Sequence, residues 1–110
     1  MLNEDAILAV KKGADYMDEN YPGWASLINF ETFEMDNCHQ CVVGQAVGEY
    51  GHAIGLASGQ KPYSREASEW AAQYGFDVPM EDFAKGDDHV YQCYVGLETL
   101  WTDQVRERLG

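Results

Sequence analysis

Apolar residues recur at helical spacing over a long stretch near the start of the chain. Between about residues 4 and 20 they form one stripe of positions one, three or four residues apart: Ala6, Ile7, Val10, Ala14 and Met17. Glu4 and Asp5 stand in the first turn, where carboxylates complement the helix dipole, and Asn3 is suited to cap it. The pattern predicts a helix over 4–20 that ends at the Tyr-Pro-Gly sequence of residues 21–23.

A second long stripe occupies the end of the chain, from about residue 87 to residue 109. Its apolar positions are Val90, Tyr91, Tyr94, Leu97, Leu100 or Trp101, Val105 and Leu109. Asp87 or Asp88 opens the stretch, while Arg106 and Arg108 close it with the charge that a helix C-terminus prefers. We therefore expect a terminal helix of about six turns.

The middle of the chain predicts shorter elements. Residues 24–35 mix the helical and strand periods, which favours a short helical turn followed by an extended piece. A helix is expected to open at Asp36 or Asn37 and to run to Tyr50, and Ser64 should cap another over 65–74. A single turn is expected at 80–83. Together these elements predict a mainly α fold, one compact domain of four to five helices over residues 1–110.

Five glycines recur at intervals of four, three, four and four residues, starting inside the predicted central helix and continuing past its end: Gly44, Gly48, Gly51, Gly55 and Gly59. Inside a helix each glycine costs about 1 kcal/mol relative to alanine. Either another helix approaches this glycine edge closely, or the helix breaks near Gly48 or Gly51. The sequence favours the break.

The composition narrows the class of protein. The chain has 19 Asp and Glu against 7 Lys and Arg, a formal net charge of −12, and its 45% hydrophobic residues exclude a disordered acidic tail. The carboxylates argue against direct binding to nucleic acid or anionic membrane, because attraction to phosphate needs clustered Lys and Arg. No apolar run approaches the roughly 20 residues that span a bilayer. The first residues also lack the order of a secretory signal, so we expect a cytoplasmic domain.

The charges are unevenly placed along the chain. No Lys or Arg occurs between Lys12 and Lys61, a stretch that holds several acids. Such one-sided charge predicts a negative surface that engages a basic surface of a partner protein. The most specific form of this hypothesis is a protein whose carboxylates mimic the phosphates of DNA. The alternative is that the acids only keep the domain dispersed in water. The predicted partner-binding residues are Asp15, Asp18, Glu19, Glu31, Glu34 and Asp36, with Trp24 as an aromatic anchor.

The cysteines offer a second kind of chemistry. Cys38 and Cys41 have the C-x2-C spacing of half a zinc site, or of a redox dithiol at a helix start, where the dipole stabilises a thiolate. The other donors in the chain, Cys93 and the histidines at 39, 52 and 89, add no second paired motif. Packing of reduced cysteines in the core is the favoured explanation. We expect Cys93 to be a packing residue as well, and His89 to be a solvated residue of a first helical turn.

Several of these motifs occur together in one known family. The pattern Ala-x3-Gly-Ala-x2-Met-Asp-Glu at 9–19, the Cys-Val-Val-Gly-Gln sequence at 41–45 and Gly-Phe-Asp at 75–77 resemble small proteins encoded by actinobacterial phages. The family has no established activity, so the resemblance implies no catalytic residues. It implies an accessory protein that acts in the cytoplasm of the infected bacterium by binding a host factor.

These observations lead to one main hypothesis and two alternatives. The chain is expected to be a non-enzymatic phage accessory protein, without cofactor, that binds and modulates a host protein such as a nucleic-acid-processing or defence factor. One alternative is a small zinc-binding or thiol-redox module centred on Cys38 and Cys41, with zinc as the cofactor. The other is a structural component of the virion. The sequence leaves the oligomeric state open.

Overall fold

The computed structural model describes residues 4–110 as an assembly of helices, with no strand in that range. The elements in chain order are α1 (Glu4–Asn20), the 3-10 helix η1 (Trp24–Leu27), α2 (Val42–Ala46), α3 (Tyr50–Ser58), α4 (Arg65–Gln73), α5 (Met80–Phe83) and α6 (Asp87–Leu109). The predicted mainly α fold is confirmed. The expected cap at Asn3 lies outside the described residues.

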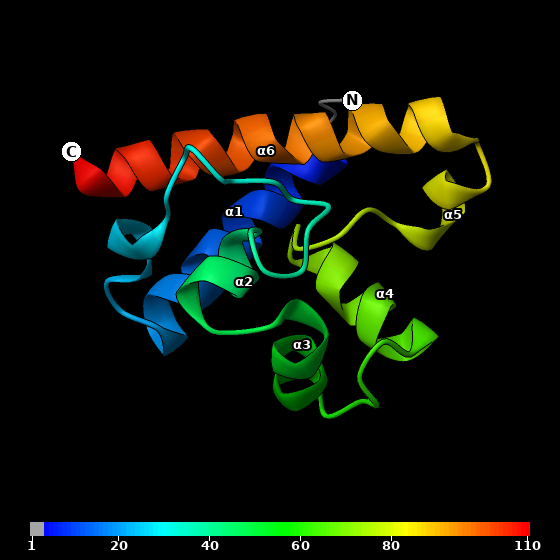
Figure 1. Ribbon diagram of the computed structural model, residues 1–110, viewed down its shortest axis with the longest axis horizontal. Coiled ribbons are helices and arrows are strands. Elements are labelled where there is room, and N and C mark those ends of the chain that lie inside the picture. The colour runs from blue at the N-terminus through cyan, green and yellow to red at the C-terminus, as the bar shows by residue number, and fades with distance from the viewer. Residues whose placement is uncertain (1–3) are drawn as a thin grey trace.

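The two long helices form where the apolar stripes predicted them. α6 runs the length of the molecule and α1 lies beside it, with α3 and α4 on the opposite side in this view (Figure 1). The inner face of α1 buries Val10, Ala14 and Met17, and that of α6 buries Trp101 and Val105. Burial of these stripes supplies the main driving force for their association.

Aromatic rings fill the space between these helices. Trp24, Phe76 and Trp101 are among the largest fully buried side chains. Phe76 stacks on Trp101 with ring centroids 5.5 Å apart, and Trp24 meets the same indole edge-on at 5.7 Å. The buried Trp101 Nε1–H donates to the carbonyl oxygen of Gly75 at 2.7 Å, which satisfies its polar group.

The central helix begins later than predicted. Residues 28–41 form turns after η1 rather than an extended segment, and α2 starts at Val42 with Cys41 as its N-cap. The Asn37 side chain accepts hydrogen bonds from the amides of His39 and Gln40, at 2.9 and 3.2 Å. Asn37 thus closes a local turn, because a short polar side chain competes with helical hydrogen bonding.

The glycine series combines both explanations that the sequence left open. α2 ends at Ala46 and α3 begins at Tyr50, so the helix breaks around Gly48 as favoured. Within α3, however, a Cβ at Gly51 would overlap the ring of Tyr63, and one at Gly55 would lie 2.8 Å from Pro62. The close neighbour is therefore the 61–63 loop rather than another helix.

The described chain is compact, with a Cα radius of gyration of 12.8 Å, close to the roughly 13 Å expected for about 100 residues. Its principal extents are 37 × 28 × 24 Å. Within residues 4–110, no helix combines the length and apolar character needed to cross a bilayer.

Candidate functional site

An open groove of about 410 Å³ lies between the loop of residues 29–36 and the outer face of α6. Its lining residues are Phe30, Phe33, Val95, Glu98, Thr99, Thr102, Asp103 and Arg106. We call it the acidic groove. The side chains of Phe30 and Val95 are 40% and 37% exposed, so apolar surface faces solvent here. Exposed apolar surface bordered by charge is typical of protein interaction sites.

Hydrogen bonds fix the loop that forms one wall of the groove. Gln45 of α2 accepts from the Asn29 amide at 2.5 Å and donates to the Asn29 carbonyl oxygen at 3.2 Å. On the other side, the Met35 amide donates to Glu98 Oε2 of α6 at 3.0 Å, and the Met35 side chain is buried. Phe30 and Phe33 then meet edge-to-face with centroids 6.3 Å apart. The Phe30 and Phe33 rings therefore lie between two anchored points of the loop, Asn29 and Met35.

Carboxylates converge on this wall. Burial raises the pKa of Glu98, and the negative charges of Asp36 and Glu34 raise it further. Glu31 and Glu34 are exposed on the same loop. Arg106 is the one cation among the lining residues, and its guanidinium carbon lies 5.6 Å from the centroid of the Phe30 ring. The surroundings of the groove therefore carry an excess of negative charge.

The predicted partner-binding acids separate into two groups. Glu31, Glu34 and Asp36 belong to the loop of the acidic groove. Asp18 instead receives two hydrogen bonds from Arg108, from Nε to Oδ1 and from Nη2 to Oδ2, both 2.8 Å. Hydrogen bonding to this guanidinium lowers the pKa of Asp18. Asp18 thus ties α1 to the end of α6.

The remaining acids of α1 have different surroundings. Asp15 Oδ1 lies 3.7 Å from Nη2 of Arg108, so its charge is compensated in part by the same guanidinium. Glu19 is exposed on α1. Neither residue lines the acidic groove.

The prediction of Trp24 as an exposed anchor is wrong. Its side chain is 1% exposed, and its Nε1–H donates to Asp18 Oδ1 at 2.9 Å. The indole belongs to the core because its ring packs on Trp101 and its polar atom has an internal partner. Phe30 and Phe33 are the aromatic residues that reach the surface near the acids. The sequence signal for them is the Phe-Glu pair that occurs twice, at residues 30–31 and 33–34.

The surroundings of Cys41 disfavour the reactive pair that its spacing from Cys38 allows. Cys41 is buried, and desolvation raises the pKa of its thiol to about 11 even though its Sγ accepts the Gly44 amide at 3.3 Å. A thiol in that state is a poor nucleophile at neutral pH. Within residues 4–110, no third Asp, Glu, His or Cys joins these two at metal-binding distance. The geometry favours the packing explanation.

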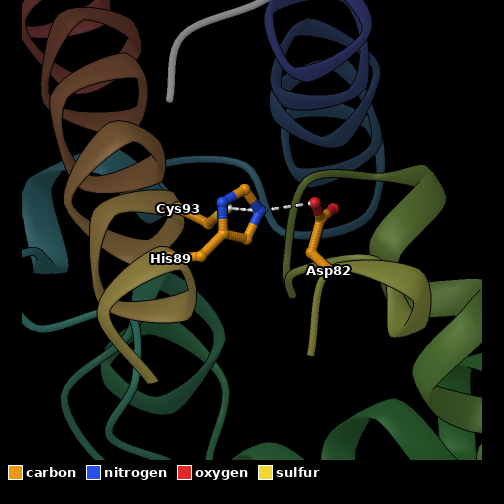
Figure 2. A group of neighbouring side chains, drawn as sticks. All are labelled: Asp82, His89 and Cys93. Carbon is orange, nitrogen blue, oxygen red and sulfur yellow. Dashed lines mark hydrogen bonds and ion pairs between the residues drawn. The ribbon is translucent and has the colours of Figure 1, made fainter. Parts of the chain in front are cut away.

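A different cluster brings together a carboxylate, an imidazole and a thiol. Asp82 of α5 lies with its Oδ1 2.7 Å from Nε2 of His89, and Cys93 Sγ lies 3.5 Å from the same nitrogen (Figure 2). The hydrogen bond from His89 lowers the pKa of Asp82. The prediction of a solvated His89 is wrong, since its side chain is 27% exposed and paired. Cys93 packs on the core as expected but also reaches this cluster.

The Asp82–His89–Cys93 cluster lies in the wall of a cavity of about 450 Å³. α1 contributes Leu8 and Lys12 to the lining, and α6 contributes His89, Cys93 and Leu97. The sequence signal for the cluster is the H-x3-C spacing of residues 89–93, which places both side chains on one face of a helix. The contribution of Asp82 depends on tertiary packing.

Asp77 is a further carboxylate that the sequence did not single out. Tyr50 of α3 donates to its Oδ2 at 3.0 Å, and Tyr94 of α6 donates to its Oδ1 at 2.8 Å. Burial raises the pKa of Asp77, while the two hydroxyl donors act in the opposite direction. This network joins α3 to α6 through the segment after α4, which is a structural role.

Comparison of the chain with protein-family models, with curated proteins and with solved structures finds no match.

Proposed function

We propose that this protein is a binding module, without catalysis of its own, that recognises a basic segment of a partner protein through the acidic groove. The observation that carries this proposal is that the negative charges of Glu34 and Asp36 act on Glu98, which lines the groove together with the half-exposed ring of Phe30. The formal charge of −12 adds a long-range attraction to basic surfaces.

The groove supports a specific partner chemistry. The strongest contributions to protein interfaces come from aromatic and apolar side chains at the centre of the contact, surrounded by a polar rim. Here Phe30, Phe33 and Val95 supply the apolar centre, and Glu98 and Asp103 supply carboxylates at the rim. A matching segment presents an apolar side chain flanked by Lys or Arg. Charge complementarity then orients the encounter and accelerates association.

The source of the partner follows from the resemblance to proteins of actinobacterial phages. That resemblance supports a host protein met in the cytoplasm of the infected bacterium, with modulation of a nucleic-acid-processing or defence factor as the outcome. The same negative charge disfavours a direct complex with nucleic acid or with an anionic lipid surface.

Two variants of equal charge test whether the groove, rather than overall acidity, selects the partner. The groove variant combines Glu31→Gln, Glu34→Gln and Asp36→Asn, and the control combines Glu66→Gln, Glu81→Gln and Glu107→Gln at exposed sites outside the groove. Each is immobilised beside the original protein, exposed to host extract, and eluted with increasing NaCl. We expect a basic host protein that the original and the control retain and the groove variant releases.

The affinity of the recovered partner then tests the aromatic centre. Loss of a central aromatic contact should weaken binding by about tenfold or more in the Phe30→Ala variant. If the groove variant and the control lose the partner equally, the attraction is general and the groove is not the site. Retention of every captured protein by the groove variant, or capture of none by the original, contradicts the proposal directly.

A further inference from the structure

Asp82, His89 and Cys93 form a second site, whose side-chain chemistry differs from that of the acidic groove. We propose that these three residues bind a single divalent ion of the zinc type. Sulfur, imidazole nitrogen and carboxylate oxygen are the donor set that zinc and cobalt accept, whereas magnesium and calcium prefer oxygen alone.

The local structure explains why the three donors meet. His89 and Cys93 are four residues apart near the start of α6, so their side chains project from one face of the helix. Asp82 lies in α5, and the short connection over residues 84–86 folds α5 back against this face. Gly86 adopts a φ of 102° in that connection, a conformation that glycine adopts without strain. The site is built from two elements adjacent in sequence.

The distances are close to those of a tetrahedral site. The three donor atoms all lie within 4.8 Å of one another. Bonds of about 2.0–2.3 Å at tetrahedral angles place the donor atoms about 3.3–3.6 Å apart. The 3.5 Å between Cys93 Sγ and His89 Nε2 already lies in this range. The 2.7 Å between Asp82 Oδ1 and the same nitrogen is shorter than this range. Metal binding therefore replaces the Asp82–His89 hydrogen bond with a separation about 0.6 Å longer.

The hydrogen-bond pattern argues against a catalytic triad of thiol, imidazole and carboxylate. Such a triad uses both ring nitrogens, one toward the nucleophile and the other toward the orienting carboxylate. Here Cys93 and Asp82 both approach Nε2 of His89 (Figure 2). One nitrogen does not serve both roles at once. Nε2 of His89 can instead coordinate, through its lone pair, an ion that Cys93 and Asp82 also bind.

The charges balance when an ion is bound. A neutral imidazole, a thiolate and a carboxylate together neutralise a divalent cation. The thiol of Cys93 loses one proton to solvent as its sulfur binds the metal, so affinity falls as the pH is lowered. With three protein ligands, the fourth position is left for a water molecule, and the adjoining cavity of about 450 Å³ gives it access.

Other charged groups around the site do not prevent binding. Lys85 Nζ lies 3.4 Å from Asp82 Oδ1, but its side chain is 60% exposed and turns readily toward solvent. Lys12 in the cavity wall is offset by the carboxylates of Asp5, Asp77 and Glu81 in the same lining.

Cobalt(II) tests the site because a thiolate ligand gives it a charge-transfer absorption and four-coordination gives it intense visible bands. Reduced, chelator-treated protein is titrated with cobalt, and zinc is then added. We expect one equivalent of cobalt with both absorptions, displaced by zinc. Cys93→Ser should abolish the charge-transfer band, and His89→Gln should weaken binding by at least about tenfold, the loss seen even for outer-shell changes. Cys38→Ser is the matched control and should bind as the original does.

The outcomes that overturn the proposal are equally distinct. Absence of cobalt binding removes the site, and loss of the charge-transfer band in Cys38→Ser rather than Cys93→Ser moves it to the C-x2-C pair. Circular dichroism of each variant verifies its helical content. His89→Gln keeps the packed thiol, so it tests the site even if Cys93→Ser does not fold. Neither variant alters the acidic groove, so this result and that of the partner capture are independent.

Discussion

At the scale of single residues, surroundings decide what each carboxylate does. Asp18 is held by the guanidinium of Arg108, which lowers its pKa. Asp77 is half-buried and accepts hydrogen bonds from two tyrosine hydroxyls, and desolvation raises its pKa. Glu34 remains in solvent, where its charge acts on Glu98 and on whatever approaches the groove. The same functional group therefore ties two helices together through an ion pair, links elements through a half-buried hydrogen-bond network, or shapes a binding surface.

Gly13 shows how strongly one position depends on its neighbours. It is buried inside α1, where a Cβ would overlap the Tyr74 carbonyl oxygen and approach the Trp101 ring to 3.0 Å. Alanine normally gains about 1 kcal/mol over glycine inside a helix, but the overlap outweighs this gain. We expect Gly13→Ala to lower the free energy of unfolding by about 2 kcal/mol, measured by urea denaturation.

Gly48 provides the control for that substitution. It lies between α2 and α3, and no atom lies within 4 Å of the site where its Cβ would stand. Gly48→Ala should change the free energy of unfolding by no more than about 0.5 kcal/mol. Equal effects at the two positions would mean that α1 does not pack against the Tyr74 carbonyl and the Trp101 ring as described.

At the scale of elements, α6 organises the molecule. It packs on α1 and η1, borders both the acidic groove and the large cavity, and supplies ligands to the proposed metal site. Its link to α3 runs through a polar network, in which Tyr50 and Tyr94 donate to the two oxygens of Asp77. Removing the hydroxyls of Tyr50 and Tyr94 while keeping the carboxylate of Asp77 isolates the contribution of these two hydrogen bonds to stability.

The double variant Tyr50→Phe and Tyr94→Phe should make stability more dependent on pH. Without the hydroxyls, the pKa of Asp77 rises further above its unfolded value of about 4. A raised folded-state pKa stabilises the protonated form, so this stability is present below pH 4 and is lost as the pH rises through the folded pKa. Urea unfolding should show a loss of about 3 kcal/mol at pH 7 and less at pH 4.

The exposed tyrosine of the same helix supplies the comparison. Tyr91 is 62% exposed on α6, so Tyr91→Phe should leave both the stability and its pH profile unchanged. A double variant that loses equal stability at pH 4 and pH 7 would show that the hydroxyls do not support an ionised Asp77. Carbon NMR titration of the Asp77 carboxyl group measures the same shift directly.

Elements with a strong local period were predictable, and sites made by tertiary packing were not. The stripes at 4–20 and 87–109 specify α1 and α6 because burying one face fixes a 3.6-residue period. The start of α2 was misplaced because Asn37 caps a turn as readily as it caps a helix. The prediction of Trp24 as a partner-binding anchor failed because an indole near acids suits a core and an interface alike. The meeting of Asp82 with His89 depends on the approach of α5 to α6, which local patterns do not specify.

At the scale of the whole molecule, the charge and the small size act together. A net charge of −12 is confined to a body of 37 × 28 × 24 Å, so its carboxylates repel one another on average. The attractive ion pairs are few and mostly at the surface, where each contributes at most about 1 kcal/mol. Self-repulsion should therefore outweigh the pairs in the folded state.

Sodium chloride should consequently stabilise the fold. Raising its concentration from about 10 mM to about 500 mM shortens the Debye length from about 30 Å to about 4 Å, which is well below the dimensions of the molecule. A gain of about 1 kcal/mol corresponds to a rise in Tm of about 4–8 °C for a domain of this size, measured by calorimetry. Chloride is chosen over sulfate because sulfate also strengthens apolar burial.

The two charge variants locate the repulsion. Glu31→Gln, Glu34→Gln and Asp36→Asn remove three charges of one loop, two of which, those of Glu34 and Asp36, act on Glu98. Glu66→Gln, Glu81→Gln and Glu107→Gln change the net charge equally at scattered positions. If repulsion is concentrated at the acidic groove, the first variant should have the higher Tm at low salt and the weaker salt dependence. A Tm that falls with added salt would instead mean that the pairing of Arg108 with Asp18 dominates the electrostatic free energy, since screening weakens attraction as well as repulsion.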